Sequence, residues 1–222
     1  MDAKYLMPLL KCPFDNHISP YVSAINQHVV EWACEFDLPQ DAAEVGRIDA
    51  TKVGSLAART APRASLHALE FLADWQVWLF LFDDKYSDES ATGADLARLS
   101  RLITAFMLVL DNGSEASDPA IRFSVALGDL MDRLAAMATD AQASRFVSAV
   151  RGYFLAQFWE AAHRADDRPA DLAEYAAMRR HSGAVPTCMA LIDVADGFEL
   201  STADHCRPDV RAVTDIAVNV TC

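Results

Sequence analysis

Residues 65–89 of this chain read SLHALEFLADWQVWLFLFDDKYSDE, an apolar stretch that ends in a cluster of carboxylates. The part that covers residues 65–82 contains neither glycine nor proline and is long enough for a helix. Its large apolar side chains recur at helical spacing on one side, while Trp78, Phe80 and Leu81 fill the other side. We therefore expect a helix that is buried almost all round.

Four carboxylates follow this stretch: Asp83, Asp84, Asp88 and Glu89. The C-terminal end of a helix carries the negative end of the macrodipole, which disfavours a nearby carboxylate by about 0.3–1 kcal/mol. A bound cation would remove that cost, and oxygen ligands favour a hard ion such as Mg²⁺, which bridges carboxylates to substrate phosphates. If the helix continues, Asp84 and Asp88 share a face with Asp83 beside it. The alternative is a solvated helix end followed by acidic loop residues.

Composition predicts one all-α domain that covers residues 1–222, with residues 1–18 as an irregular arm. Hydrophobic residues make up 52% of the 222 residues and charged residues 23%, while alternating strand patterns are hard to find. The net charge of −13 argues against nucleic acid and against anionic membrane surfaces as partners. It also suggests that an anionic substrate would need metal ions as intermediaries.

The cysteines and the N-terminus indicate the compartment. The five cysteines are widely spaced without a Cys-x-x-Cys pair, so neither a disulfide framework nor a zinc site is expected. The N-terminus lacks a signal-peptide profile, and no uncharged apolar run has membrane-spanning length. We expect a cytoplasmic protein.

Capping residues, prolines and apolar periodicity divide the chain into further helices. They are expected at residues 20–36, 49–60, 65–82, 95–110, from 119 to about 137, and at 140–163, 171–183, 187–194 and 208–222.

The helix predicted at residues 171–183 ends in Arg179-Arg-His-Ser-Gly183, and Pro186 follows before an apolar segment resumes. A break inside a buried helix exposes backbone polar groups, and two nearby arginines would make that place suitable for an anion. The alternative is a simple kink at Pro186 with both arginines facing solvent. The residues alone leave both interpretations open.

Taken together, these motifs resemble the bacterial-type class I terpene synthases. The resemblance runs along essentially the whole chain and is carried by the following segments: Pro13-Phe14, Trp32, Asp-Trp-x-x-Trp-Leu-Phe-x-Phe-Asp-Asp84, Tyr153-Phe154 with Trp159-Glu160, and Tyr175-x-x-x-Arg-Arg-His-Ser-Gly183. It implies an all-helical α-domain bundle around a central apolar cavity. It also implies an enzyme that cyclises a linear prenyl diphosphate, with farnesyl diphosphate expected first.

The resemblance assigns roles to the acidic cluster and to the helix break. Asp83-Asp84-Lys-Tyr-Ser-Asp88 would be a lengthened aspartate-rich motif, in which Asp83 bridges Mg²⁺ to diphosphate and Asp84 and Asp88 support it. The intact family normally uses three Mg²⁺ ions, for which Mn²⁺ can substitute. At the break, Arg179 would sense the diphosphate.

Two positions beside that arginine and three aromatic rings complete the implied site. Ser182 would be the linker residue and Gly183 the effector residue. Ionisation of the diphosphate leaves an allylic cation, and each aromatic face near it contributes about 0.5–2 kcal/mol. Phe80, one turn before the first aspartate, is the best candidate for such a face. Two weaker candidates lie on a later helix, Phe154 and Phe158.

One departure from the family pattern is clear. The second metal motif, Asn-Asp-x-x-Ser-x-x-x-Glu, belongs just downstream of residues 219–222, and a later Arg-Tyr pair is also absent. We therefore expect the 222 residues to be the N-terminal two-thirds or so of a truncated synthase, with little or no cyclase activity alone.

Several alternatives stay open from the sequence. One is a diterpene cyclase that acts on geranylgeranyl diphosphate, and another is a non-catalytic or degenerate helical domain that binds prenyl chains. A chain-elongating prenyltransferase should show a second aspartate-rich motif, a pattern that Asp166-Asp167 lacks. Motifs of head-to-head synthases are not visible. Family members often pair, so a homodimer is one expected state.

Overall fold

The computed structural model describes residues 14–87, 95–166 and 168–221. Within these ranges the regular elements are all helical. The α-helices are α1 (Val22–Glu35), α2 (Ala42–Thr51), α3 (Val53–Thr60), α4 (Leu66–Phe82), α5 (Leu96–Asn112), α6 (Arg122–Met137), α7 (Asp140–Ala165), α8 (Leu172–Ser182), α9 (Val185–Met189), α10 (Ile192–Asp196), α11 (Thr202–His205) and α12 (Pro208–Thr221). A π-helical turn, η1 (Asp83–Ser87), extends α4, and a 3-10 turn, η2 (Gly113–Ala116), follows α5.

The predicted all-α class is confirmed, and most predicted helices are present within a few residues of the expected bounds. Two differ. Residues 49–60 do not form one helix, because Lys52 adopts a left-handed φ of 52° that separates α2 from α3. Asp41 caps α2 by accepting from the amides of Ala43 and Glu44, a start signal that the prediction overlooked. Residues 187–194 are likewise divided between α9 and α10.

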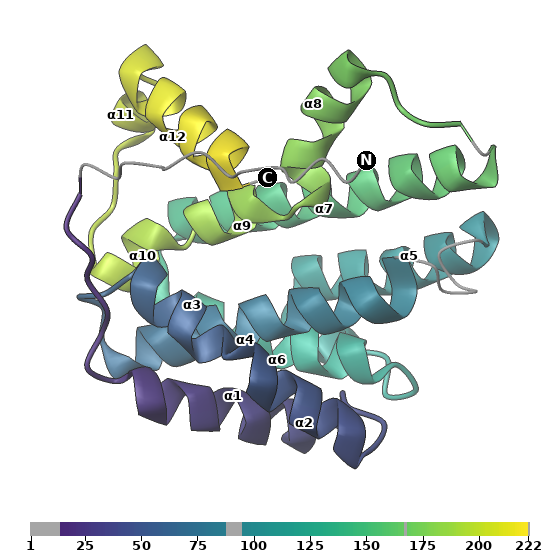
Figure 1. Ribbon diagram of the computed structural model, residues 1–222, viewed down its shortest axis with the longest axis horizontal. Helices are drawn as coiled ribbons and strands as arrows, with labels where there is room; N and C mark the ends of the chain where they lie inside the picture. Colours follow the sequence, from purple (N-terminus) through teal and green to yellow (C-terminus); the bar gives the residue numbers. More distant parts are fainter. Residues whose placement is uncertain (1–13, 88–94, 167, 222) are drawn as a thin grey trace, which may run out of the picture.

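Helix α4 occupies the middle of the molecule, where it packs against α1, α3, α6 and α10 (Figure 1). Its N-terminus is capped by Ser65, whose hydroxyl accepts from the Ala68 amide. Every residue from Ala68 to Leu79 except Glu70 is buried, as is Phe82. The prediction of a helix buried almost all round is therefore confirmed.

An aromatic stack runs along α4 toward its C-terminal end. The rings of Trp75 and Trp78 stack at 5.5 Å, and those of Trp78 and Phe82 stack at 5.1 Å. Phe106 of α5 and Phe123 of α6 meet Trp78 edge-on at 5.4 and 5.7 Å, a favoured geometry for aromatic pairs. The stack thereby locks α4 to its neighbours close to the point where the carboxylates begin.

A buried polar contact joins α4 to the break between α8 and α9. The indole N–H of Trp75 donates to the Thr187 hydroxyl at 2.8 Å, and that hydroxyl donates to the Ala184 carbonyl at 2.6 Å. Ala184 adopts a φ of 56°, a left-handed conformation that costs a non-glycine residue about 1–3 kcal/mol. The hydrogen bonds from Thr187 and Trp75 help to hold this strained backbone in place.

We predict that Thr187→Val destabilises the protein by about 2 kcal/mol, because it leaves the buried indole N–H of Trp75 without a partner and removes one of the two hydrogen bonds that the Ala184 carbonyl accepts from residue 187. The free energy of unfolding in urea measures this. Thr104→Val is the matched control, because its exposed hydroxyl also donates to a helix carbonyl, that of Ser100, at 2.8 Å. Equal stability of both variants would contradict the structural role given to Thr187.

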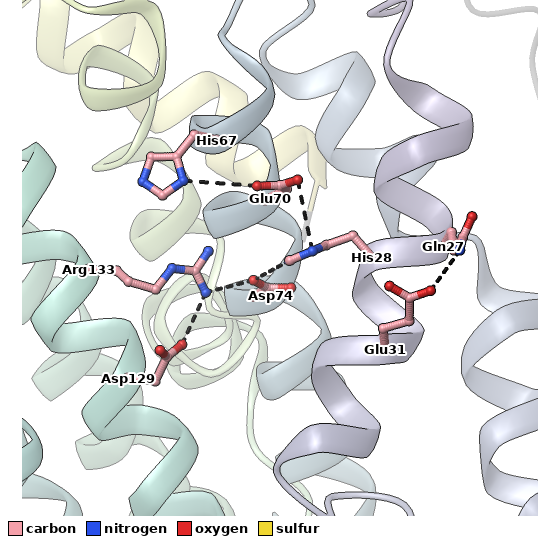
Figure 2. Close-up of polar contacts among 8 residues, drawn as sticks. All are labelled: Gln27, His28, Glu31, His67, Glu70, Asp74, Asp129 and Arg133. Atoms are coloured by element: carbon pink, nitrogen blue, oxygen red, sulfur yellow. Dashed lines mark hydrogen bonds and ion pairs between the residues drawn. The ribbon is translucent and has the colours of Figure 1, made fainter.

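A second buried polar group joins α1, α4 and α6, and Figure 2 shows its side chains pointing toward one another. The carboxylate of Asp74 is fully buried; its Oδ2 lies 2.9 Å from His28 Nε2 and accepts from Arg133 Nη1 at 2.8 Å. Arg133 Nη1 also donates to Asp129 at 3.1 Å, and the Trp32 indole donates to the same Asp129 oxygen at 3.0 Å. Residues far apart in sequence therefore share one charged network.

The network changes the ionisation of its members. Its hydrogen bond to Asp74 raises the pKa of His28 above the ordinary 6.5, and the charges of Asp74 and Glu70 add to this rise, while burial and Arg133 oppose it. Burial raises the pKa of the Asp74 carboxyl, and the hydrogen bonds from His28 and Arg133 counter that rise. Protonated His28 is thus stabilised by folding.

We predict that this stabilisation depends on pH. Because the folded state raises the pKa of His28, its contribution is fully present below about pH 6.5 and is lost as the pH rises through the folded-state value. The difference in unfolding free energy between the wild type and His28→Gln should therefore shrink from pH 6 to pH 8. His67→Gln, on an exposed side chain of the same region, is the control. A difference that stays constant across this range would exclude the mechanism.

Within the described residues, no helix combines the length and the apolar character needed to cross a membrane.

Candidate active site

The carboxylates of the acidic motif begin where α4 changes into the π-helical turn η1. Single π-turns at the end of an α-helix are uncommon and occur often at functional sites. Asp83 is half-buried on this turn and Asp84 is exposed. The α-helix ends at Phe82 as expected, and the chain continues as the π-helical η1, so the condition for the shared face, a continuing α-helix, is not met over residues 83–87. Asp88 and Glu89 lie outside the described residues.

Asp83 faces α7. The hydroxyl of Tyr153, a residue that is only 2% exposed, donates to Asp83 Oδ1 at 3.4 Å. The ring of Tyr153 also packs edge-on against Phe82 at 6.0 Å, so the aromatic core positions it. A neutral hydroxyl donor favours the ionised carboxylate, the form that a cation requires.

Helix α7 also lies against the break between α8 and α9. A Cβ placed on Gly152 would lie 3.2 Å from His181 Nδ1, so α8 approaches the α7 backbone closely at that glycine. Gly152 directly precedes Tyr153 in α7. The same turn of one helix therefore touches both the acidic motif and the end of α8, two segments that are about a hundred residues apart in the sequence.

The break itself is confirmed. Helix α8 ends at Ser182, the amide of Gly183 donates to the Arg179 carbonyl at 2.8 Å, and α9 begins at Val185. The hydroxyl of Ser182 is buried and has no hydrogen-bond partner within the described residues. The break thus presents a polar group that the rest of the described chain does not satisfy.

The two arginines before the break differ in their surroundings. Arg180 forms an ion pair with Asp215 of α12. Arg179 is half-buried and, within the residues that the structure describes, makes no hydrogen bond or ion pair through its side chain. Burial and the charge of Arg180 lower the pKa of His181 below 6.5, so this imidazole is neutral at neutral pH. Of the two arginines, Arg179 is therefore the one whose charge is not paired with a described carboxylate.

The predicted aromatic faces do not share one environment. Phe80 is 47% exposed and, together with Asp84, lines a cavity of about 440 Å³ whose other described lining residues include members of α2, α3 and α6 but none of α7 or α8, so this cavity does not include the helix break. Phe154 is fully buried and stacks on Phe106 at 5.6 Å, so it is a core residue and its prediction as a cavity face is wrong. Phe158 is half-buried and packs against the same core.

The acidic motif fits a divalent cation that is shared with a phosphate group. Mg²⁺ is commonly held by one or two carboxylates, with substrate phosphates and water as its other ligands, and Asp83 and Asp84 supply such carboxylates. No group of three or more histidine, cysteine or acidic side chains able to hold a metal occurs among the described residues.

Two contacts at this site were missed by sequence reasoning. The hydroxyl of Tyr153 reaches Asp83 across 70 residues of sequence, and Trp75 reaches Thr187 across 112 residues. Both residues were identified from the sequence as members of segments that resemble the family, but no polar partner was predicted for either side chain. No local spacing links residues this far apart, so only the fold reveals these pairs.

Comparison with known proteins gives the family. A family profile described as "Terpene synthase family 2, C-terminal metal binding" matches residues 74–222. The chain is 38% identical over 99% of its length to a 4-epi-cubebol synthase, named as cyclising (2E,6E)-farnesyl diphosphate, from Streptosporangium roseum. It is 37% identical over its full length to a (+)-T-muurolol synthase with the same named substrate from Roseiflexus castenholzii.

Solved structures agree with these relatives. The crystal structure of the SVS_A2 protein from ancestral sequence reconstruction covers 97% of the chain with a TM-score of 0.91 at 29% identity, and 66% of that protein is matched. Wild-type cucumene synthase shares the fold, with a TM-score of 0.80 over 95% of the chain and 70% of its own. The chain spans 66% of the 4-epi-cubebol synthase and 67% of the T-muurolol synthase. With a profile match over most of its length and relatives this similar, the chain belongs to the bacterial-type class I terpene synthase family.

Proposed function

We propose that this chain carries the diphosphate-ionising part of a sesquiterpene cyclase. The reaction would convert linear farnesyl diphosphate into a cyclic hydrocarbon or alcohol and release diphosphate. One observation carries the proposal: Asp83 ends a buried aromatic helix and faces Tyr153, while the adjacent Gly152 touches the end of α8, which bears Arg179. The proposed metal-binding carboxylate and a cation that has no ion pair within the described residues thereby border the same helix.

The proposal assigns Mg²⁺ to Asp83 and Asp84, with Asp88 as a third ligand and Mn²⁺ as a substitute. When bound, the metal would neutralise the diphosphate and so make it a better leaving group. The family profile supports a metal in general terms. The choice of magnesium rests on the oxygen-only donors of the motif.

Side chains and backbone groups of the chain itself would bind the diphosphate and stabilise the cation. Arg179 would bind the departing diphosphate through charge-assisted hydrogen bonds, which are shorter and stronger than neutral ones. Ser182 and Gly183, as linker and effector residues, would present polar groups of the break toward the reacting end of the substrate. The half-exposed ring of Phe80 would stabilise the allylic cation by about 0.5–2 kcal/mol.

Farnesyl diphosphate is the proposed substrate because both synthases described above are named for cyclising it. Water must be kept from the cation, because its capture would end the reaction early. The aromatic stack of α4 and the rings of α5, α6 and α7 packed against it supply a dry, rigid wall beneath the acidic motif.

Binding and turnover test the proposal separately. We predict that the chain binds farnesyl diphosphate more tightly in Mg²⁺ than in EDTA, as measured by calorimetry. Asp83→Asn should weaken the Mg²⁺-dependent binding at least about tenfold, because it removes about one charge-assisted contact. Gas chromatography should detect any terpene product from farnesyl diphosphate in preference to geranylgeranyl diphosphate.

Asp166→Asn is the matched control, because it removes an exposed carboxylate that also follows a long helix, α7. It should bind farnesyl diphosphate as the wild type does. Binding that is equal in Mg²⁺ and EDTA, or that survives in Asp83→Asn, would refute the role given to this motif. Preferred binding of geranylgeranyl diphosphate would favour the diterpene alternative.

A further inference from the structure

Most lysine and arginine side chains of the described residues form ion pairs with carboxylates, as expected for a chain of net charge −13. Four that form none within the described part of the chain surround one cavity: Lys85, Arg98, Arg101 and Arg122. Like charges that gather without partners repel one another. Their arrangement therefore indicates that a bound anion would offset the repulsion between these four side chains.

The cavity has a volume of about 710 Å³ and lies between η1, α5 and the start of α6. Its apolar lining includes Leu102, Ile121 and Phe123. Ligand pockets of proteins commonly measure about 300–1,000 Å³ and combine apolar walls with a few polar groups. Both the size and the composition of this cavity fit a small organic anion.

Local contacts fix the positions of the cations. Arg98 and Arg101 are three residues apart on α5 and so lie on one face of that helix. Arg122 Nη1 donates to the Asp37 carbonyl at 2.9 Å, which positions its guanidinium without neutralising it. The ammonium of Lys85 lies 5.7 Å from the ring centre of Phe123. None of these contacts supplies a negative charge.

The described lining residues include a single carboxylate, Asp118, which can offset only one of the four positive charges. Its Oδ1 accepts from the amide of Ala120 at 2.9 Å, so this carboxylate already stabilises the turn before α6. The cavity adjoins the one lined by Phe80 and Asp84, because Lys85 and Phe123 line both, but it does not include the space between Asp83 and α7. Asp83 faces Tyr153 of α7, whereas the lining residues of the cavity include none from α7 or α8.

We propose that this cavity binds the phosphate or diphosphate group of a small molecule directly, without a metal ion. The paired guanidinium groups of Arg98 and Arg101 suit such a group, because arginine can donate two parallel hydrogen bonds to phosphate oxygens. The apolar lining would receive the organic part of the ligand. This proposal does not rest on the proposed cyclase activity, because its residues take no part in that reaction.

Calorimetric titration with inorganic diphosphate in EDTA tests the proposal, because chelation removes metal-dependent binding at the acidic motif. The double variant Arg98→Gln/Arg101→Gln should bind at least about tenfold more weakly than the wild type, as expected for the loss of charge-assisted hydrogen bonds. Arg211→Gln is the control, since Arg211 is exposed on α12 and forms no ion pair within the described residues; it should bind as the wild type does. Circular dichroism confirms folding, and Arg101→Gln alone replaces the double variant if that one fails to fold.

Three results would overturn the proposal. The first is absence of diphosphate binding by the wild type, and the second is equal binding by the double variant. The third is loss of binding in Arg179→Gln instead, which would place the diphosphate at the helix break. A parallel arm uses vesicles that contain an anionic phospholipid. Binding to vesicles that depends on Arg98 and Arg101, without binding of free diphosphate, would assign the cavity to a membrane surface and also overturn the proposal.

Discussion

Stacking of Trp75, Trp78 and Phe82 along α4 is the interaction on which the other features of the structure depend. Rings from α5, α6 and α7 pack edge-on against this stack, so α4 can neither rotate nor slide without breaking several aromatic contacts at once. The C-terminal end of the stack directs Asp83 toward α7. At its other end, Trp75 donates to Thr187 and so fixes the helix break. One rigid helix therefore sets the geometry of both halves of the candidate site.

Charge is distributed very unevenly over this acidic molecule. The carboxylates of Asp83 and Asp84 belong to the same π-turn, η1, as Lys85, which lines the cationic cavity together with Arg98 and Arg101. Taken alone, the net charge of −13 indicates that an anion would need metal ions as intermediaries to bind this protein. That argument holds for the average surface, but it does not apply to a cavity in which, among the described lining residues, four cations face one carboxylate. The local arrangement of charged side chains, and not the net charge, therefore determines where an anion can bind.

Much of the fold could be predicted because its signals are local. The buried helix α4 follows from its apolar residues and its Ser65 cap, and the break after Ser182 follows from Gly183 and Pro186. The separation of α2 from α3 was missed, because it depends on the left-handed backbone conformation of Lys52, which sequence patterns do not predict. Helix propensity and capping residues thus explain where the helices form, but they do not explain every boundary between neighbouring helices.

The candidate site was less predictable, because its contacts are long-range. The position of Asp83 at a helix end could be read from the sequence, but its partner Tyr153 comes from a helix much later in the chain. Phe154 was predicted as a cavity face, yet ring packing from α4 and α5 buries it completely. The sequence pattern shows which residues of a helix are apolar, whereas tertiary packing determines which of these residues face a cavity.

The most direct measurement of the central claim is anomalous diffraction from crystals of this chain grown with Mn²⁺ and diphosphate. We predict a manganese peak within coordination distance of the Asp83 carboxylate, with the diphosphate between this ion and Arg179. A peak at another carboxylate cluster, or diphosphate bound with no metal near Asp83, would contradict it.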